Sequence, residues 1–396
     1  MVFGFLLARA GVDVVVLEKH KDFLRDFRGD TVHPSTLEVM RELGLLEEFL
    51  KRPHQELREF TGMIGGVPVR IADLSHVPAH CKFVALMPQW DFLDFLAEHA
   101  KRYANFHLLM EAEVVDLLTK DERTVGVSVK TPNGPLRIEA DLVAGADGRH
   151  STVREKARLP RDEFGVPIDV LWMRLSKRPD DPNTTLGRIG AGAIFVTLDR
   201  GDYWQCAFVI EKGGAETLRQ AGLQAFRDLI VRIAPVFADR VAELKDWEQI
   251  KLLTVIVDRL RQWYREGLLC IGDSAHAMSP IGGVGINLAV QDAVAAANIL
   301  AEPLRNRTLR LDDLKKVQKR REWPTRMTQG LQMIMQDQVM TRVLQLKREP
   351  KPPLAVKLLD RFAFLRRIPA RFIAVGFRPE HVRTSEQPPG AAPPSR

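Results

Sequence analysis

The stretch CIGDSAHAMSPIGGVGINLAVQDA, Cys270 to Ala293, decides the fold class. An apolar run ends at Asp273, and a glycine-rich loop then leads into a helix that begins near Ile286. In α/β proteins ligands bind at the carboxyl ends of parallel strands, and the free N–H groups of a helix N-terminus attract anions. The stretch therefore predicts a ligand site. In it Asp273 would accept a hydrogen bond from a ligand hydroxyl, and the Asn287 side chain would form a further hydrogen bond with the ligand. The alternative is a glycine-rich loop with a helix cap.

A second stretch, GADGRHSTVR, has the same strand–turn–helix form. It follows an apolar strand and covers Gly145 to Arg154. Its glycines let the backbone approach a ligand closely, and Asp147 is able to accept a hydrogen bond from a hydroxyl or to bind an arginine. The competing interpretation is a capped loop in which Ser151 is the N-cap of a helix.

The first residues read as the later part of a dinucleotide-binding unit. A helix over Val2–Ala10 precedes a β-branched strand, Val12–Leu17, which ends at Glu18. Gly4 suits a helix that crosses a strand closely, and an acidic residue at this strand end accepts hydrogen bonds from ribose hydroxyls. The alternative is an ordinary helix–glycine–strand connection, as found in many α/β proteins, without a role in ligand binding.

The strand and G-x-G-x-x-G turn that begin such a unit are not found before Met1. We therefore expect that the sequence is incomplete at its N-terminus by about 12 residues, counting a strand of ordinary length and the turn. Without that strand we expect weak or no retention of a dinucleotide cofactor, since its N–H groups cradle the pyrophosphate.

Composition is that of a globular protein, with 45% apolar and 28% charged residues among 396. The net charge of +7 is concentrated in residues 302–383, which hold 20 Lys and Arg against 8 Asp and Glu. We expect the basic surface of this helical segment to face solvent or another subunit, with contact to a membrane surface as the alternative. We expect no nucleic-acid partner. Three distant cysteines, no metal-ligand spacing and no signal peptide or spanning run predict a cytoplasmic protein without a metal.

Four segments together resemble the para-hydroxybenzoate hydroxylase family of single-component FAD-dependent monooxygenases. They are the Glu18 segment, RGDTVHPSTLEVMRELGL, GADGRHSTVR and GDSAHAMSPIGGVGINLAVQDA, in order over roughly residues 1–345. The resemblance implies an α/β fold, in which a Rossmann-like FAD domain is interleaved with a mixed or antiparallel sheet for the substrate. A helical C-terminal segment follows.

The resemblance also implies domain boundaries. The inserted sheet and the dinucleotide-domain pieces alternate along the chain, and Pro324 is expected to kink or break the C-terminal helix. LGRIGAGAIF, Leu186 to Phe195, carries its glycines in reversed spacing and predicts a hairpin. The expected boundaries are 1–54, 88–165 and 259–301 for the FAD domain, 55–87 and 166–258 for the substrate domain, 302–384 for the helical segment and 385–396 for a disordered tail.

For the cofactor, the resemblance implies a residue for each part of FAD. Glu18 would bind the adenosine ribose, and the backbone at Val114 would meet the adenine. Arg28 would lie near the pyrophosphate or ribityl chain, and Gln89 near the flavin chain. Asp147 and Asp273 would also contact FAD, with the Asp147 motif serving NAD(P)H as well. The residues expected to line the isoalloxazine ring are Pro280, Gly283, Gly285, Ile286 and Asn287.

The implied reaction starts with NADH or NADPH reducing FAD, after which reduced flavin captures O2 as a C4a-hydroperoxide and hydroxylates an aromatic, phenol-like substrate. No catalytic side chain is assigned, since His276 and His33 suit packing as well as chemistry. Alternatives are another flavoprotein on this scaffold, such as an epoxidase, a halogenase or a polyprenyl-type reductase, and an inactive relic or assembly partner. The sequence leaves open the substrate, the choice of NADH or NADPH, and a homodimer.

Overall fold

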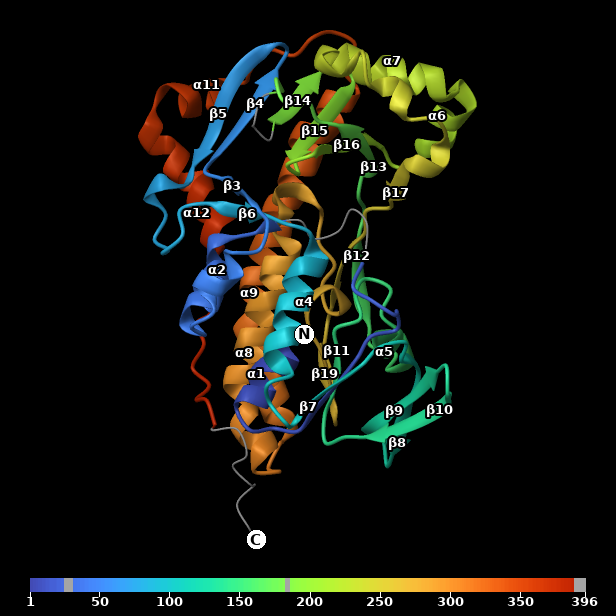
Figure 1. Cartoon of the computed structure of the whole chain (residues 1–396), viewed down its shortest axis with the longest axis vertical. Coiled ribbons are helices and arrows are strands. Elements are labelled where there is room, and N and C mark those ends of the chain that lie inside the picture. The colour runs from blue at the N-terminus through green and yellow to red at the C-terminus, as the bar shows by residue number, and fades with distance from the viewer. Residues whose placement is uncertain (25–30, 182–185, 388–396) are drawn as a thin grey trace.

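The structure, a computed structural model, describes residues 1–24, 31–181 and 186–387. Figure 1 shows an elongated molecule with a large sheet at one end and two long helices, α8 and α9, running from that sheet toward the other end. The shorter parallel strands and a small antiparallel sheet lie beside the lower half of these helices. The expected α/β architecture with an interleaved second sheet is confirmed.

The parallel strands belong to two separate sheets. β1 (Val14–Leu17) pairs with β7 (Phe106–Leu109), whereas β11 (Val143–Gly145) pairs with β20 (Leu268–Cys270), which also pairs antiparallel with β19 (Tyr264–Arg265). Within the described residues no strand pairs with both β1 and β11. The expectation of a strand before Met1 stays a prediction.

Helix α1 (Val2–Arg9) lies against β1, and Gly4 makes this contact possible. A Cβ atom on Gly4 would be 2.7 Å from Cγ2 of Val16 and 3.2 Å from Cγ1 of Val14. Any larger residue would push the helix off the strand, as the sequence predicts for a close helix–strand crossing. The other face of α1 contacts α4 (Gln89–Ala100) and α8.

Two small antiparallel sheets complete this half. One is a meander of β8 (Glu113–Lys120), β9 (Arg123–Thr131) and β10 (Gly134–Glu139), whose last turn contains the expected Asn133-Gly134 pair. The second contains β2 (Thr31–Val32), β6 (Val84–Leu86) and β3 (Gln55–Leu57). Short helices and one strand connect these parts: α2 (Pro34–Glu42), α3 (Leu46–Phe49), α5 (Thr152–Lys156) and β12 (Arg161–Phe164), which pairs with β18 (Val257–Leu260).

The large sheet has seven strands in the order β17-β13-β16-β15-β14-β4-β5. Two strands from the first hundred residues therefore extend a sheet made mostly by the inserted region. The turn between β14 and β15 is the expected hairpin. The bounds are β17 (Lys251–Leu253), β13 (Ile168–Ser176), β16 (Tyr203–Glu211), β15 (Ala193–Asp199), β14 (Leu186–Gly190), β4 (Glu59–Ile64) and β5 (Val67–Asp73).

One face of this sheet is covered by α6 (Ala215–Ala221) and α7 (Leu223–Ile233) (Figure 1). Phe195, Phe208 and Phe226 are fully or almost fully buried in the resulting core. The alternation of strand side chains sends their neighbours, such as Val196 and Ala207, to the opposite face. That opposite face is packed only in part, by α10 and the turn before it.

Helix α8 (Gly285–Arg305) is the central helix, and α9 (Leu311–Met335) packs along it. By length and composition the segment 281–305 is apolar enough to cross a membrane, but 61% of its most apolar window is buried inside the protein, as in a core helix. Helix α9 continues through Pro324, so the expected break is wrong. A π-helical turn (Gln336–Met340) and α10 (Thr341–Leu344) follow.

The C-terminal segment folds back on the body of the protein. Helices α11 (Leu354–Arg361) and α12 (Arg367–Val375) lie beside β5, and residues after Gly376 run back without helix toward α1 (Figure 1). The backbone N–H of Gln387 donates to the carbonyl of Arg9 at 2.9 Å. The helical part of this segment therefore ends nine residues before the expected boundary at 384.

Candidate active site

Three strands of the parallel sheets end in the acidic or glycine-rich residues singled out in the sequence. Glu18 follows β1, the GADGR turn follows β11, and Asp273 follows β20. Because β11 and β20 are parallel neighbours, their carboxyl ends lie side by side. The Glu18 carboxylate is half-exposed, and its Oε1 accepts the backbone N–H of His20 at 2.9 Å.

Asp147 and Ser151 cap helix α5. The backbone N–H of Val153 donates to Asp147 Oδ2 at 3.1 Å, and that of Arg154 donates to Ser151 Oγ at 2.9 Å. The interpretation of Ser151 as an N-cap is confirmed, and it does not exclude a ligand, because the Asp147 residue as a whole remains exposed.

Arg149 joins the two motifs. Its Nη2 lies 3.5 Å from Oδ2 of Asp273, whose side chain is 30% exposed. Its Nη1 is buried and has no hydrogen-bond partner within the described part of the chain. A buried guanidinium nitrogen without a partner carries a desolvation cost that an acceptor would remove. This donor set fits phosphate, hydroxyl and carbonyl oxygens, which are the polar groups of FAD.

Arg154 holds the surrounding backbone in place. Its Nη1 donates to Asp258 Oδ2 at 3.1 Å and to the Ser274 carbonyl at 3.2 Å, and its Nη2 donates to the Arg149 carbonyl at 2.6 Å. The Arg154 and Asp258 side chains are 4% and 1% exposed. Because one guanidinium bonds both motif loops, their relative position depends on this buried ion pair.

The glycine-rich loop packs against β2. Gly283 has φ +62°, and a Cβ there would lie 2.3 Å from Thr31 Oγ1. That hydroxyl donates to the Gly283 carbonyl at 2.9 Å. Both the backbone conformation and the contact with Thr31 therefore require glycine.

Asn287, in the first turn of α8, fastens the same loop. Its Nδ2 donates to the carbonyls of Thr31 at 3.0 Å and Gly283 at 3.1 Å. Its Oδ1 accepts from the backbone N–H of His33 and from the Thr36 hydroxyl, both at 2.8 Å. Two donors and two acceptors fill the capacity of an amide. The side-chain amide therefore has no free donor or acceptor, so the geometry gives the Asn287 side chain a positioning role. The predicted place of Asn287 beside the isoalloxazine ring stays a prediction.

Three glutamines of one helix bind the loop from the other side. We call Gln329, Gln332 and Gln336 the glutamine ladder; all three are buried. Each directs its Nε2 toward oxygen atoms of residues 277–281 or of β18, which lies beside them. The bonds go to the Asp258 carbonyl at 2.8 Å and the Ala277 carbonyl at 3.0 Å from Gln329, to the Ser279 and Ile281 carbonyls at 3.0 and 2.9 Å from Gln332, and to Ser279 Oγ at 2.9 Å from Gln336.

The glutamine ladder sets the direction of the loop's peptide groups. The described chain contains no cis peptide bond, so the N–H of Gly282 points opposite to the Ile281 carbonyl that Gln332 binds. It therefore points away from α9. Gln332 Oε1 is buried without a partner among the described residues, and exchanging its oxygen and nitrogen would turn an acceptor toward two carbonyls.

A buried charged network lies behind the loop. His276 Nε2 lies 2.5 Å from Asp292 Oδ2, and Arg321 Nε donates to Asp292 Oδ1 at 2.9 Å. Burial alone would raise the pKa of Asp292, but the contacts with His276 and Arg321 hold it below the ordinary value. The His276 ring packs against Trp263 at 4.9 Å between centroids. His276 thus has a packing environment, as the sequence analysis allowed.

His33 is also packed. The ring is 1% exposed, and Nδ1 lies 2.6 Å from the Ile373 carbonyl of α12. Because a carbonyl only accepts, Nδ1 carries the proton. Burial lowers the pKa of His33 to about 4, although this hydrogen bond opposes the change. The imidazole is therefore neutral near pH 7.

The remaining candidate residues lie at the edges of this region. Gln89 is the first residue of α4 and is half-buried, while Val114 pairs with Val129 in the β8–β9 sheet. Arg28 lies outside the described residues. Across those residues no cluster of His, Cys, Asp and Glu could hold a metal ion.

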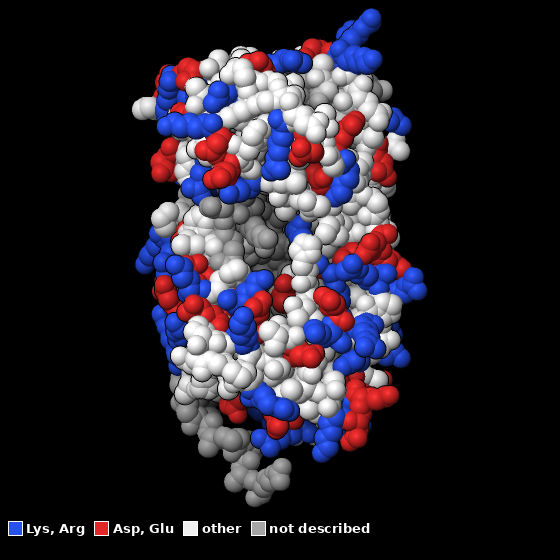
Figure 2. Space-filling view, turned by 90° about the vertical axis from the view of Figure 1, so that its right-hand side faces the viewer, with Lys and Arg blue, Asp and Glu red and all other residues white. Residues whose placement is uncertain are grey.

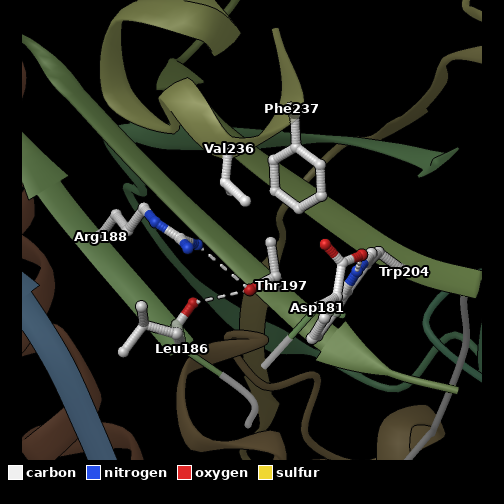
Figure 3. Close-up of a pocket in the computed structure, with 7 residues that line it drawn as sticks. All are labelled: Asp181, Leu186, Arg188, Thr197, Trp204, Val236 and Phe237. Atoms are coloured by element: carbon white, nitrogen blue, oxygen red, sulfur yellow. Dashed lines mark hydrogen bonds between the residues drawn. The ribbon is translucent and has the colours of Figure 1, made fainter. Parts of the chain in front are cut away.

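A small cavity lies on the helix-covered face of the seven-stranded sheet (Figure 3). Its volume of about 10 Å³ suffices for one water molecule, whereas small-molecule sites measure about 300–1,000 Å³. Arg188 reaches Thr197 Oγ1 there at 3.3 Å, and burial lowers the pKa of Arg188. The size excludes this cavity as a site for an aromatic substrate.

Figure 2 shows that this side of the molecule is hollowed between its upper and lower parts. The upper part is the end that carries the seven-stranded sheet, and the lower part carries the parallel strands. The half-buried side chains Val196 and Leu198 lie on the sheet face opposite α7, which is packed only in part.

Comparison with known proteins identifies the class. The family described as "FAD binding domain" matches residues 1–329, so the chain belongs to this family of FAD-binding proteins. The chain is 31% identical to 6-methylpretetramide 4-monooxygenase of Streptomyces rimosus over 386 residues, which are 97% of this chain and 91% of that protein. The resemblance to the para-hydroxybenzoate hydroxylase family is confirmed, and the chain is an FAD-dependent monooxygenase of the aromatic-hydroxylase type.

Other relatives are more distant. The chain is 28% identical to rifampicin monooxygenase of Streptomyces venezuelae over 309 residues, covering 72% of this chain but only 58% of that protein. The crystal structure of p-nitrophenol 4-monooxygenase from Pseudomonas putida superposes with a TM-score of 0.73 over 93% of both chains at 20% identity. This likeness bears on the fold alone.

Sequence reasoning missed three elements of the site. Arg149, Arg154 and the glutamine ladder are not distinguished by residue type from the other arginines and glutamines of the chain. A usable signal existed only for the ladder. Residues 329, 332 and 336 share one face of a helix, and the apolar residues 327, 331 and 334 fall on another.

Proposed function

We propose that this chain binds FAD at the edge formed by β1, β11 and β20 and uses NADH or NADPH and O2 to hydroxylate an aromatic, phenol-like substrate. The family membership supports FAD and monooxygenase chemistry. The observation that carries the proposal is the junction at Arg149, where a buried, unpartnered guanidinium nitrogen lies next to Asp273.

The residues that would hold FAD are assigned by chemistry. Glu18 and Asp273 offer carboxylates to hydroxyl groups, Asp147 orders the turn after β11, and Arg149 offers a cation to an acceptor. The glycine-rich loop, including Pro280, Gly283, Gly285 and Ile286, would border the isoalloxazine ring. When bound, FAD supplies the redox and oxygen-activating chemistry.

The chain's own residues hold the two motif loops in position and fix the direction of the Gly282 N–H. Arg154 fixes the distance between the two motif loops, and the glutamine ladder turns the Gly282 N–H away from α9. An N–H group held in a fixed direction stabilises negative charge without reorganisation at the moment of reaction. The described structure offers no side chain that must act as a general base, and the catalytic residue stays unassigned.

We place the substrate against the face of the seven-stranded sheet opposite α7, which is packed only in part and on which Val196 and Leu198 are half-buried. The relative with 31% identity is named 6-methylpretetramide 4-monooxygenase, and another relative is named para-nitrophenol 4-monooxygenase. A panel of 6-methylpretetramide, nitrophenols and other phenols is therefore the first set to test. A second candidate follows from dialkyldecalin synthase of Streptomyces rugosporus, 27% identical over 314 residues, whose name denotes no oxygenation.

The test measures binding and turnover separately. Purified protein is titrated with FAD by fluorescence, and NADH or NADPH oxidation and O2 uptake are then recorded with and without each phenol. The proposal expects saturable FAD binding on titration, which is compatible with weak retention of the cofactor during purification. It also expects substrate-stimulated O2 uptake and a product heavier by one oxygen atom. FAD binding with a product of unchanged mass would favour the second candidate, and no binding would refute the proposal for this chain.

Arg149→Met tests the assigned site. Loss of the guanidinium should weaken FAD binding roughly tenfold or more, as expected for one charge-assisted hydrogen bond. Arg137→Met, at an exposed position of β10, is the matched control and should leave the FAD dissociation constant unchanged. Equal affinities for the Arg149 variant and the control would remove Arg149 from the site.

A further inference from the structure

Helices α11 and α12 expose apolar side chains on the surface of the protein. Both pack against β5, the edge strand of the seven-stranded sheet, and a short turn of 3-10 helix, Ala363–Arg366, joins them (Figure 1). Helix α12 buries the small residues Ala370 and Ala374 against β5 and its neighbours, so its larger side chains lie elsewhere. The exposed apolar side chains, which we call the C-terminal patch, have exposed fractions of 73% for Leu354, 40% for Leu358, 42% for Phe362, 61% for Phe364, 57% for Ile368 and 38% for Phe372.

The C-terminal patch is continuous from one helix to the next. Phe362 directly follows α11, and its ring lies 6.0 Å from that of Phe364 between centroids. Within each helix the apolar residues are four positions apart, at 354 and 358 and at 368 and 372, so each pair lies on one side of its helix. Contiguous exposed apolar surface of this kind marks an interaction site.

Basic side chains accompany the apolar ones at a fixed spacing. The sequences are KLLDRF at 357–362 and RIPARF at 367–372, so a basic residue directly precedes an apolar residue of the patch four times. These basic residues are all exposed, and within the described part of the chain none of them forms an ion pair. They are Lys357, Arg361, Arg367 and Arg371.

The acidic residues of this region are engaged with the body of the protein. Residues 347–378 contain nine Lys and Arg but two acidic residues, Asp360 and Glu349. Asp360 Oδ1 accepts the backbone N–H of Arg70 in β5 at 3.1 Å. Glu349 Oε1 accepts the backbone N–H of Ala191, in the turn between β14 and β15, at 3.4 Å. The outward surface of the two helices therefore combines apolar and cationic side chains.

We infer that the C-terminal patch binds the surface of an anionic lipid bilayer. Amphipathic helices with large apolar and basic side chains lie in the plane of the membrane interface, with the apolar side chains at the acyl boundary and the basic ones attracted to anionic headgroups. Each basic residue beside an apolar one matches this boundary, because long basic side chains extend toward the phosphates. A second copy of this chain fits less well, since contact between two such patches would oppose cations to cations.

The first experiment measures binding of the full chain to vesicles by co-sedimentation. Vesicles of phosphatidylcholine with phosphatidylglycerol are compared with vesicles of phosphatidylcholine alone. Binding to the anionic vesicles is expected to be roughly tenfold stronger or more, and to weaken as the salt concentration rises, because salt screens the attraction between the headgroups and the basic side chains. Equal binding to both kinds of vesicle would refute the inference, and so would no binding to either.

The basic residues are tested as a pair. Arg367→Gln combined with Arg371→Gln should weaken binding to the anionic vesicles roughly twentyfold, since each basic residue near an anionic surface contributes about fivefold. The matched control is Lys315→Gln combined with Lys319→Gln, which removes the same net charge from two exposed positions, also four residues apart, near the start of α9. The control should bind as wild type does, and equal weakening in both double variants would refute a specific role of the patch.

A site-specific label tests whether the apolar side chains enter the bilayer. The cysteines of the chain, Cys81, Cys206 and Cys270, are buried, so Ile368→Cys supplies an accessible thiol for an environment-sensitive dye. Its emission should shift to shorter wavelength and gain intensity on anionic vesicles. The same label at Leu136→Cys, an exposed apolar position of β10, should not respond. An unchanged signal at position 368 would refute insertion.

The last variant separates the lipid surface from a second copy and from the FAD site. Phe364→Ser combined with Ile368→Ser should weaken vesicle binding roughly tenfold or more, because binding strength scales with the apolar area buried in the interface. Affinity for FAD and thermal unfolding should match wild type. If wild type self-associates without binding vesicles and this variant is monomeric, the patch is a contact between copies and the inference is wrong.

Discussion

Helices α8 and α9 run side by side, yet the part of α9 from Pro324 onward buries mostly polar side chains, whereas α8 buries mostly apolar ones. Helix α8 buries alanines and aliphatic side chains, among them Val294, Ala296 and Leu300, in the main apolar core. Helix α9 buries Arg321 and the glutamine ladder. It exposes large apolar side chains on its other side, namely Trp323, Met327, Leu331 and Ile334. The difference shows that a helix takes its buried face from what it packs against, because α9 meets carbonyls and carboxylates where α8 meets side-chain hydrocarbon.

The two helices therefore stabilise the site in different ways. Helix α8 supplies a rigid apolar support, and its first turn holds β2 through Asn287. Helix α9 orients the glycine-rich loop through hydrogen bonds whose removal would leave buried carbonyls without donors. Polar packing of this kind is costly when incomplete, so single substitutions in α9 should have large effects.

The largest effect is expected at Arg321. This side chain is 1% exposed and bonds Asp292, Glu380 and the Arg378 carbonyl. Arg321→Met removes the buried guanidinium that Asp292 and Glu380 share, and we expect a loss of about 3–5 kcal/mol in the free energy of unfolding. Urea denaturation measures it.

The matched control for Arg321→Met is Arg320→Met. Arg320 also binds Glu380, but its side chain is 28% exposed, so water screens the charge. A loss of about 1 kcal/mol or less is expected there. Equal losses for the two variants would contradict the special role of the buried face of α9.

A smaller effect, dependent on pH, is expected near the first turn of α8. The folded pKa of His33 is lowered to about 4 from an ordinary value of 6.5. As pH falls from 6.5 toward 4, the unfolded chain binds a proton at His33 that the folded protein does not. The contribution of His33 to the free energy of unfolding is therefore fully present above pH 6.5, and about 3 kcal/mol of it is lost by pH 4.

His33→Asn isolates this contribution. The difference in unfolding free energy between wild type and variant is measured at intervals from pH 7 to pH 4.5. It should shrink as pH falls, because the variant lacks the titrating group. A difference that stays constant over this range would show that His33 is not buried in the neutral form.

The smallest effect is expected for the glutamine ladder. Gln332→Leu removes the donor from the Ser279 and Ile281 carbonyls, at a cost of about 1–3 kcal/mol. Because the Gly282 N–H loses its fixed direction, FAD binding should weaken as well. Gln338→Leu, at an exposed position of the π-helical turn that follows α9, is the control for both measurements. Weaker FAD binding in the control variant as well would exclude a specific role for Gln332.

Much of the fold was readable from local patterns. The α/β class, the hairpin at Gly190–Gly192 and the helices α1, α4 and α8 follow from apolar periodicity and glycine positions. The break expected at Pro324 was wrong because buried contacts hold α9 on both sides of the proline, those of Leu314 and Val317 before it and those of Gln329 and Gln332 after it. The cost of one missing hydrogen bond is smaller than that of releasing those contacts.

The candidate site also has a part that could be predicted from the sequence and a part that could not. Asp147, Asp273 and Gly283 could be predicted because a strand–turn–helix segment requires particular residue types at neighbouring positions of the sequence. The sequence by itself therefore determined the family, the cofactor class and the strand ends that present acidic residues. Arg149 and Arg154 were not distinguishable, because their partners lie more than a hundred residues away.

Only the tertiary structure decided which polar groups form hydrogen bonds across such separations. It also decided that β2 and α2 take up the hydrogen bonds of the Asn287 side chain, and that α9 exposes its apolar side. The physical reason is that backbone conformation and periodic burial are local properties of a sequence. The satisfaction of a buried donor depends on which acceptor packing brings within about 3 Å of it.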